Sequence, residues 1–150
     1  MFIQVATEEL IFRGYFTQLL AAHFQSKVIW MGVPSVLFGL GHYAPSTYGE
    51  NAWLIVGITC LFGLMLTEVT VRTGNLAPAI AVHFVNNIFA LLIVGLDGDL
   101  SMLSLYVMPF GAEDVEALRT ALLLSIGYLI ALFVAFLVLW PIFQRRRLLA

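Results

Sequence analysis

Three groups of polar residues in this apolar chain have types and spacing that could perform chemistry. The first group contains Glu8, Glu9 and Arg13 in the stretch TEELIFRGYF. The second is His42, which ends FGLGH, and the third begins at His83 in HFVNN. An ionisable side chain within a membrane segment is costly and marks a candidate functional site by default. These residues are therefore the first candidates for a site.

Helical spacing separates the two glutamates. Glu9 and Arg13 are four residues apart, so they share one face of a helix and can form an ion pair. Glu8 is rotated by about 100° from Glu9 and points elsewhere. A carboxylate that faces a cavity beside a neutralised pair suits a general base. The same three residues would equally suit a structural ion network at a helix end.

The two histidine groups add hydrogen-bonding capacity. His83 and Asn87 are four residues apart, which suits a cavity wall or hydrogen bonds between packed helices. His42 follows Phe38 by one turn, and a histidine there suits either a packed core or catalysis. Taken together, Glu8 and His42 would orient and deprotonate a water molecule. His83 and Asn87 would donate hydrogen bonds to a developing oxyanion, so the set would hydrolyse a peptide bond.

Other protease chemistries fit the sequence less well. It contains neither an H-E-x-x-H motif nor a G-x-S-x-G elbow. The aspartates of GLDGD, residues 95–99, lack the second membrane-embedded aspartate of a carboxylate dyad, and Cys60 reads as a small core residue. Zinc hydrolysis remains an alternative, because Glu8, His42 and His83 are residue types that bind zinc with water at a fourth position.

The composition defines the elements that must hold these residues. The 150 residues are 61% hydrophobic and only 11% charged, whereas soluble domains carry roughly 25% charged residues. The sequence therefore indicates an integral membrane protein, and the bilayer is its expected surrounding. The net charge of −2 and the lack of a basic, aromatic-rich patch argue against a nucleic-acid partner.

Apolar runs predict an all-α, polytopic transmembrane helix bundle with about five membrane segments. The chain is expected to form a single membrane-embedded domain over residues 1–150, and the short stretch before Glu8 predicts that further N-terminal helices are lacking. Residues 121–143 form the last predicted segment, and residues 144–150 form a basic tail. The other predicted segments are residues 1–23, 28–43, 51–71 and 77–96.

Loop charges predict how the chain is oriented in the membrane, and this orientation places His42 and His83 at different depths. Arginines 145–147 place the C-terminus on the cytoplasmic side by the positive-inside rule. With helices of alternating direction, His42 would lie about 21 Å along its helix and His83 only about 9 Å. A broken helix around residues 39–45 would reduce this offset.

The three motifs together resemble those of the CPBP family, the CAAX-protease and bacteriocin-processing membrane proteases also called the Abi family. EELIFR resembles its E-E-x-x-x-R motif, FGLGH its F-x-x-x-H motif, and HFVNN its H-x-x-x-N/D motif. All three occur in order within residues 1–95. The resemblance extends to type II CAAX prenyl endopeptidases, which implies a glutamate-dependent intramembrane endopeptidase, formerly classed as a metalloprotease.

The resemblance also implies roles for individual residues. Glu8 and His42 would activate the water. His83 and Asn87 would form the oxyanion hole. The supporting residues would be Glu9, Arg13 and Phe38.

The expected partner is a peptide or protein substrate, with lipid-modified C-terminal peptides, bacteriocin leaders and surface proteins as candidates. No cofactor is expected, with zinc as the alternative, and the expected location is a bacterial or archaeal plasma membrane. A non-enzymatic module for proton relay, transport or immunity is the alternative from another class, because intramembrane Glu, His and Asn also build relays.

Overall fold

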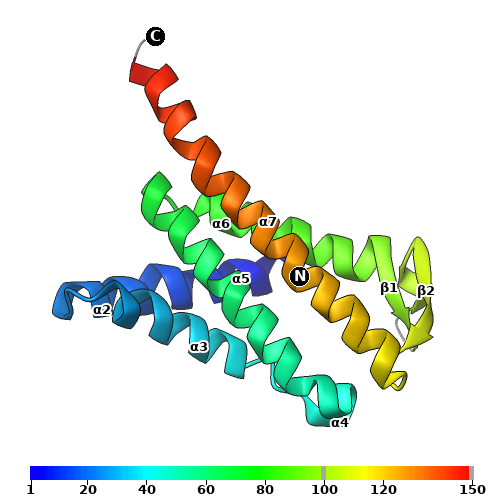
Figure 1. Ribbon diagram of the computed structural model, residues 1–150. Helices are drawn as coiled ribbons and strands as arrows, with labels where there is room; N and C mark the ends of the chain where they lie inside the picture. The colour runs from blue at the N-terminus through cyan, green and yellow to red at the C-terminus, as the bar shows by residue number, and fades with distance from the viewer. Residues whose placement is uncertain (99–100, 149–150) are drawn as a thin grey trace.

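The first helical run carries the two glutamates and the arginine. The computed structural model describes residues 1–98 and 101–148 (Figure 1). Its first helix, α1 (Phe2–Glu9), continues through a wider π-helical turn at Leu10–Phe16 into α2 (Thr17–His23). Within the wide turn, the Thr17 hydroxyl donates to the carbonyl of Phe12, five residues earlier, at 2.8 Å.

The second run leads to His42. A π-helical turn at Val28–Gly32 precedes α3 (Val33–Leu40), which has a proline in its first turn. The helix ends two residues before His42, and the chain turns into the short α4 (Pro45–Tyr48). The helix therefore breaks within residues 39–45, where a break was expected to reduce the difference in depth between His42 and His83.

The remaining elements form the rest of the bundle and one end of the molecule. A π-helical turn at Phe89–Ile93 and a 3-10 turn at Ser101–Leu103 lie between the elements that follow. The elements are α5 (Ala52–Thr73), α6 (Ala77–Ile88), β1 (Val94–Asp97), β2 (Tyr106–Gly111) and α7 (Val115–Leu148).

Local signals explain the reversal between α5 and α6. Gly74 ends α5 in the left-handed conformation, with φ of +65°, which glycine adopts without steric cost. The Asn75 side chain then accepts the backbone N–H of Ala77 at 2.8 Å. A proline also lies in the first turn of α6, where its missing N–H costs nothing. These features bring α6, and with it His83, back against α5.

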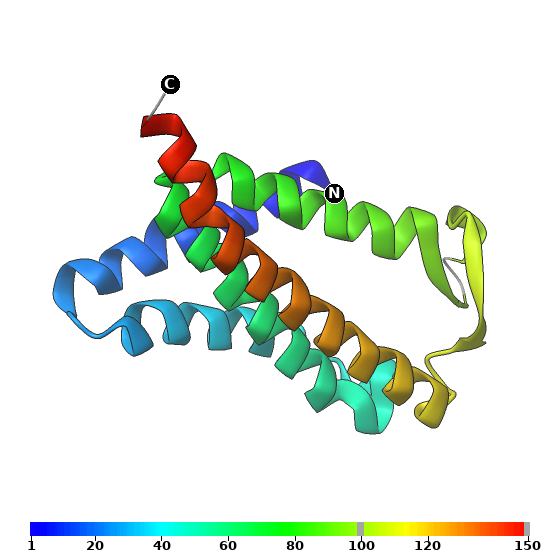
Figure 2. The ribbon, with the colours of Figure 1, turned by 45° about the horizontal axis from the view of Figure 1, so that its top comes forward.

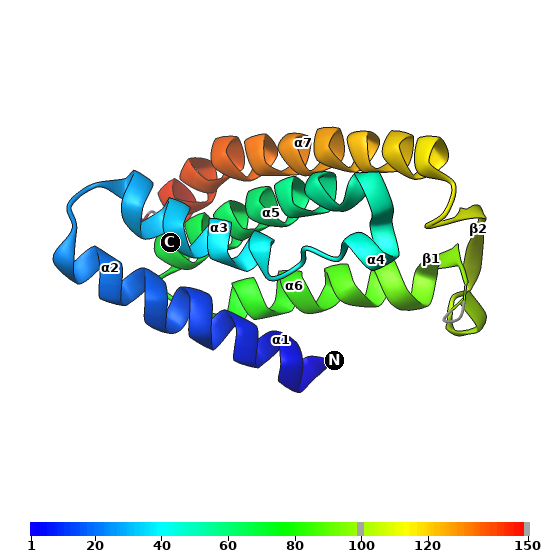
Figure 3. The ribbon, with the colours of Figure 1, turned by 90° about the horizontal axis from the view of Figure 1, so that it is seen from below.

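α5 lies at the centre of the bundle, between α7 on one side and α6 on the other (Figure 3). The backbones of α5 and α3 approach closely at Gly39, where an added Cβ would collide with Cys60 of α5. Small residues commonly permit such close approach between membrane helices. The buried core is Phe38, Phe62, Met65, Leu66, Ala79 and Leu129.

The helical runs alternate in direction along the chain (Figure 2). Two helical stretches, Pro45–Thr73 and Val115–Gln144, are long and apolar enough to cross a membrane, judged by length and composition. Val28–Leu40 and Ala77–Ile93 are shorter apolar helices. The fold is therefore mostly helical, as the sequence predicts.

Two short strands depart from the all-α prediction. β1 pairs in parallel with β2, and Val94 lies opposite Tyr106. The predicted helix over residues 77–96 accordingly ends at Ile93. The sequence of β2, YVMPFG, is rich in β-branched and aromatic residues, and its proline is disfavoured in a helix interior.

Candidate active site

The centre of the candidate site is the carboxylate of Glu9, which is fully buried. Its Oε1 accepts a hydrogen bond from Nη1 of Arg13 at 2.9 Å. The same oxygen lies 2.7 Å from Nδ1 of His83, on α6. Because an ionised carboxylate only accepts hydrogen bonds, Nδ1 of His83 carries the hydrogen. Glu9 therefore joins the first and third sequence motifs in space.

The guanidinium of Arg13 is also buried, with only 1% of the residue exposed. Its Nη2 donates to the backbone carbonyl of Gly63 on α5 at 3.1 Å. Its Cζ lies 4.6 Å from the centroid of the Phe38 ring, in the range of a cation–π contact. Arg13 thus balances the charge of Glu9 and links the first helical run to both α3 and α5.

The imidazole of His83 lies between the two glutamates. Its Nδ1 faces Glu9, and its Nε2 lies 3.7 Å from Oε2 of Glu8. The rings of Phe38 and Phe62 meet it edge-on, with centroids at 5.7 and 5.5 Å. These apolar walls and the hydrogen bond to Glu9 fix the ring, so that Nε2 is held facing Glu8.

Glu8 is the more accessible of the two carboxylates, with 24% of its side chain exposed. Its Oε1 accepts a hydrogen bond from Nε2 of Gln4 at 3.1 Å. Gln4 and Asn87 both line a cavity of about 410 Å³. The Oδ1 of Asn87 accepts from Asn86 at 3.3 Å, which leaves the Nδ2 hydrogens of Asn87 available to another acceptor. Glu8 therefore contacts Gln4, which lines a cavity that has an amide donor in its wall.

His42 reaches the site through Phe38 rather than through Glu8. Its Nδ1 donates to the carbonyl of Phe38 at 2.8 Å, and the two rings lie 4.8 Å apart. Nε2 of the neutral ring is then left as the acceptor. Among the described residues, His42 forms no hydrogen bond or ion pair with Glu8. His42 and His83 are therefore brought together by one shared phenylalanine.

The alternative zinc ligands are not assembled in this arrangement. In residues 1–98 and 101–148, no three His, Cys, Asp or Glu side chains lie close enough together to hold a metal ion. Glu8 and His83 are neighbours, but His42 is directed to its own helix carbonyl. As they lie, Glu8, His42 and His83 do not fit a three-ligand zinc site.

Two contributors to the site come from α5, which carries none of the three motifs. Phe62 packs on His83, and the Gly63 carbonyl binds Arg13. The sequence analysis missed both residues. A phenylalanine and a glycine in an apolar helix are ordinary core residues, and only the contact with Arg13 distinguishes Gly63.

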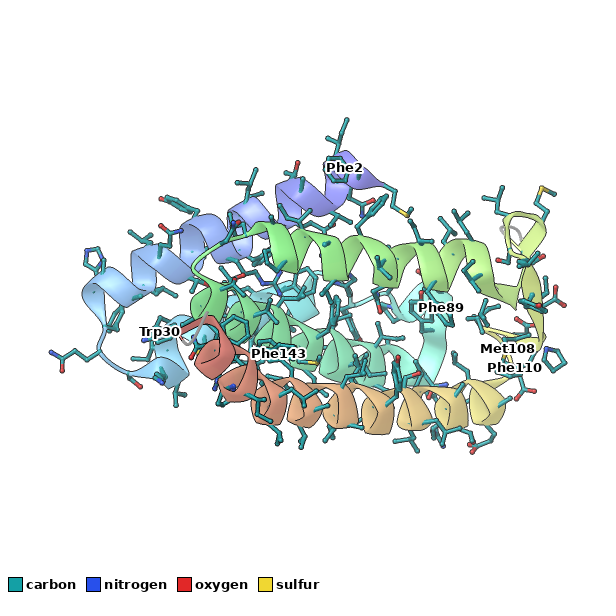
Figure 4. The ribbon with its side chains drawn as sticks, turned by 90° about the horizontal axis from the view of Figure 1, so that it is seen from above. Phe2, Trp30, Phe89, Met108, Phe110 and Phe143 are labelled. Carbon is teal, nitrogen blue, oxygen red and sulfur yellow. The ribbon has the colours of Figure 1, made fainter. Side chains whose placement is uncertain are left out.

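A second, more apolar cavity lies on the other side of Phe62. It has a volume of about 710 Å³ and is bounded by residues of α5, α6 and α7, with Phe89 from the turn that extends α6. Figure 4 shows Phe89 directed into the space between α6 and α7. Phe62 lines this cavity and also contacts His83, so one aromatic ring touches both the cavity and the imidazole.

Comparison with known proteins agrees with the motifs. The family model described as "Type II CAAX prenyl endopeptidase Rce1-like" matches residues 1–89, which include α1, α3, α5 and all of α6. The uncharacterized protein YyaK of Bacillus subtilis (strain 168) is 33% identical over 89 residues. That alignment covers 58% of this chain and 29% of YyaK, so the chain corresponds to less than a third of that relative. No solved structure matches the chain.

The matching family model covers more than half of the chain. The chain belongs to the type II CAAX prenyl endopeptidase Rce1-like family. Members of this family are integral membrane proteins, and the family implies a protease.

Proposed function

We propose that this protein is an intramembrane endopeptidase of the CAAX type, in which Glu8 and His42 activate water and His83 and Asn87 stabilise the oxyanion. The observation that carries the proposal is the position of His83 between the two glutamates. Glu9, fully buried, holds Nδ1 at 2.7 Å, while Nε2 faces the accessible Glu8 at 3.7 Å. One glutamate is thus committed to structure, and the other is free to act as a base.

In the proposed reaction, Glu8 takes a proton from water as the water oxygen attacks the scissile carbonyl. His42, whose Nε2 is an acceptor, helps to orient that water. The resulting tetrahedral intermediate carries a negative oxygen, which accepts hydrogen bonds from Asn87 Nδ2 and His83 Nε2. Its collapse breaks the C–N bond, and the proton held by Glu8 passes to the leaving amine.

Glu9 has a specific part in this scheme. Nδ1 of His83 already donates to Glu9, so Nε2 donates to the oxyanion only when the ring carries both hydrogens. The carboxylate at 2.7 Å fixes the orientation of that ring. Glu9 therefore orients the imidazole, as a carboxylate does for the histidine of a serine-protease triad.

The proposed setting is the plasma membrane of a bacterium or archaeon, with about five membrane segments and a cytoplasmic C-terminus. The alternating direction of the helical runs supports this topology (Figure 2). The proposed substrate is a peptide or protein, and a lipid-modified C-terminal segment is the leading candidate. Processing of bacteriocin leaders or surface proteins is the alternative within the same chemistry.

The decisive experiment is a cleavage assay with the purified chain in lipid nanodiscs. Synthetic peptides ending in an isoprenylated cysteine motif, and the same peptides without the lipid, are compared by mass spectrometry. Wild type should cleave, and Glu8→Gln should lose about 100- to 10,000-fold in kcat, the usual share of a general base. Glu68→Gln is the matched control, because the Glu68 side chain is 18% exposed, similar to the 24% of Glu8, but lies outside the site.

Three outcomes would redirect the proposal. Full activity in Glu8→Gln would disprove the role of Glu8 as base. Loss of activity under strict chelation, restored by zinc, would favour the zinc alternative. Binding of the peptides without turnover, unchanged in Glu8→Gln, would favour a non-enzymatic relay or immunity module.

A further inference from the structure

Besides the Phe62 ring, α5 contributes a backbone atom to the site. The carbonyl oxygen of Gly63 accepts two hydrogen bonds, from Nη2 of Arg13 at 3.1 Å and from the hydroxyl of Thr67 at 2.9 Å. Gly63, Thr67 and Arg13 are all buried. A buried carbonyl that receives a charged donor from another helix is a strong and directional contact.

The absence of a side chain at Gly63 is as important as its carbonyl. A Cβ placed there would lie 3.2 Å from Nη2 of Arg13 and 3.2 Å from both Cα and Cβ of Ser35 on α3. These distances are shorter than ordinary carbon contacts, and Ser35 Cα belongs to the backbone. A larger residue would therefore displace the guanidinium, or α3, or both.

Arg13 transmits any displacement directly to the reacting groups. Its Nη1 holds Oε1 of Glu9 at 2.9 Å, and that same oxygen holds Nδ1 of His83 at 2.7 Å. The chain of contacts from Gly63 to His83 thus passes through only two side chains, both fully buried or nearly so. No exposed or mobile group interrupts it.

We infer that Gly63 is a positioning residue of this site, acting through Arg13 and Glu9 on the imidazole of His83. The inference rests on the proposed function. It assigns to α5, outside all three sequence motifs, the task of fixing the arginine. Gly63 touches no substrate in this assignment, so its replacement should affect kcat and leave KM unchanged.

The test compares two glycines of the same helix. Gly63→Ala should lower kcat about 10- to 100-fold, as misplacement of a reacting group by a fraction of an ångström does. Gly57→Ala is the matched control, because Gly57 is exposed and a Cβ there meets nothing within 4 Å. Since alanine favours helix more than glycine does, Gly57→Ala should keep or raise Tm, whereas Gly63→Ala should lower it.

A double-mutant cycle separates positioning from general damage to the fold. If Gly63 acts through Arg13, then Gly63→Ala should add no more than about a twofold loss in an Arg13→Lys background, because contacting residues are not additive. Wild-type kcat in Gly63→Ala, or an equal loss in both backgrounds, would overturn the inference. Equal rises in KM after both glycine substitutions would do the same.

The same cycle is measured on Tm, which needs no activity. If wild type cleaves no peptide, the proposed function fails. Coupling between Gly63→Ala and Arg13→Lys in Tm would still establish the contact as an anchor of the arginine. Additive changes in Tm would show that Gly63 and Arg13 are not coupled, which would overturn the inference. The two failures are therefore distinguishable in one set of variants.

Discussion

Oε1 of Glu9 lies 2.7 Å from Nδ1 of His83, although the two residues are 74 positions apart in the sequence. This contact assigns different tasks to two adjacent glutamates. Glu9 is enclosed with Arg13 and His83, and Glu8 remains partly accessible. Of the two adjacent carboxylates, one thus holds the histidine and the other stays open to its surroundings.

Removing the Glu9 carboxylate should destabilise the protein strongly. Glu9→Ala leaves the buried Arg13 without its counter-ion, and breaking a buried pair in this way costs about 3–5 kcal/mol. Thermal unfolding in detergent measures the loss. Glu50→Ala removes one of the two exposed carboxylate partners of Arg119 and should cost less than about 1 kcal/mol. Similar losses in the two variants would contradict the central position of Glu9.

His42 should be essential for cleavage and dispensable for membrane insertion. His42→Ala is expected to lower kcat by about 100- to 10,000-fold, as loss of an acid–base group does. His23→Ala is a close control, because Nδ1 of His23 also donates to the carbonyl four residues earlier at 2.8 Å. Carbonate extraction of membranes checks insertion of both variants. Equal activity of the two variants would remove His42 from the reaction.

The amide of Asn87 should matter more than that of its neighbour. Asn87→Ala removes a proposed oxyanion donor and should lower kcat about 100- to 1,000-fold, with little change in KM. Asn86→Ala removes an adjacent, exposed amide that donates to Oδ1 of Asn87, and should lower kcat much less than Asn87→Ala does. Steady-state kinetics on one reporter peptide compares them. A larger loss of kcat in Asn86→Ala than in Asn87→Ala would contradict the assignment of the oxyanion contact to Asn87.

The Phe38 ring should be required for the relative placement of the two histidines. Phe38→Leu stays apolar but removes the ring that contacts His42, His83 and Arg13, and kcat should fall about 10- to 100-fold. Phe136→Leu, in α7, is the control for loss of an aromatic ring that packs elsewhere. Cleavage kinetics and Tm are measured on both. A fall in Tm without a fall in kcat would restrict Phe38 to packing.

The sequence predicted the local relations well because helical spacing governs them. The pairing of Glu9 with Arg13 follows from four-residue spacing, and the apolar runs predict the helices. The contact between Glu9 and His83 depends on how α1 docks against α6, which no spacing rule contains. The Gly63 contact was missed for the same reason, since every residue has a backbone carbonyl and residue type does not indicate which carbonyl binds an arginine.

The strands show a different limit. The apolar run after α6 continues without a polar break, so hydrophobicity alone extended the predicted helix to residue 96. In the structure, the helix stops at Ile93, where the chain becomes extended and pairs with β2. Pairing between segments is non-local, and an apolar run is compatible with either a helix or a buried strand.

The π-helical turn at Leu10–Phe16 lies between two α-helical halves of one continuous helix, and it determines how the faces of the two halves are rotated about the helix axis. A wide turn of this kind behaves as a single-residue insertion into an α-helix, and such insertions are frequent at functional sites. Deleting one residue within it, such as Gly14, would let the helix close into a regular ladder and rotate one half by about 100° against the other. The half that carries Glu8 and Glu9 could then no longer face α6 while the α2 half kept its packing. The direction in which this site points is thus set by one extra residue in the helical count.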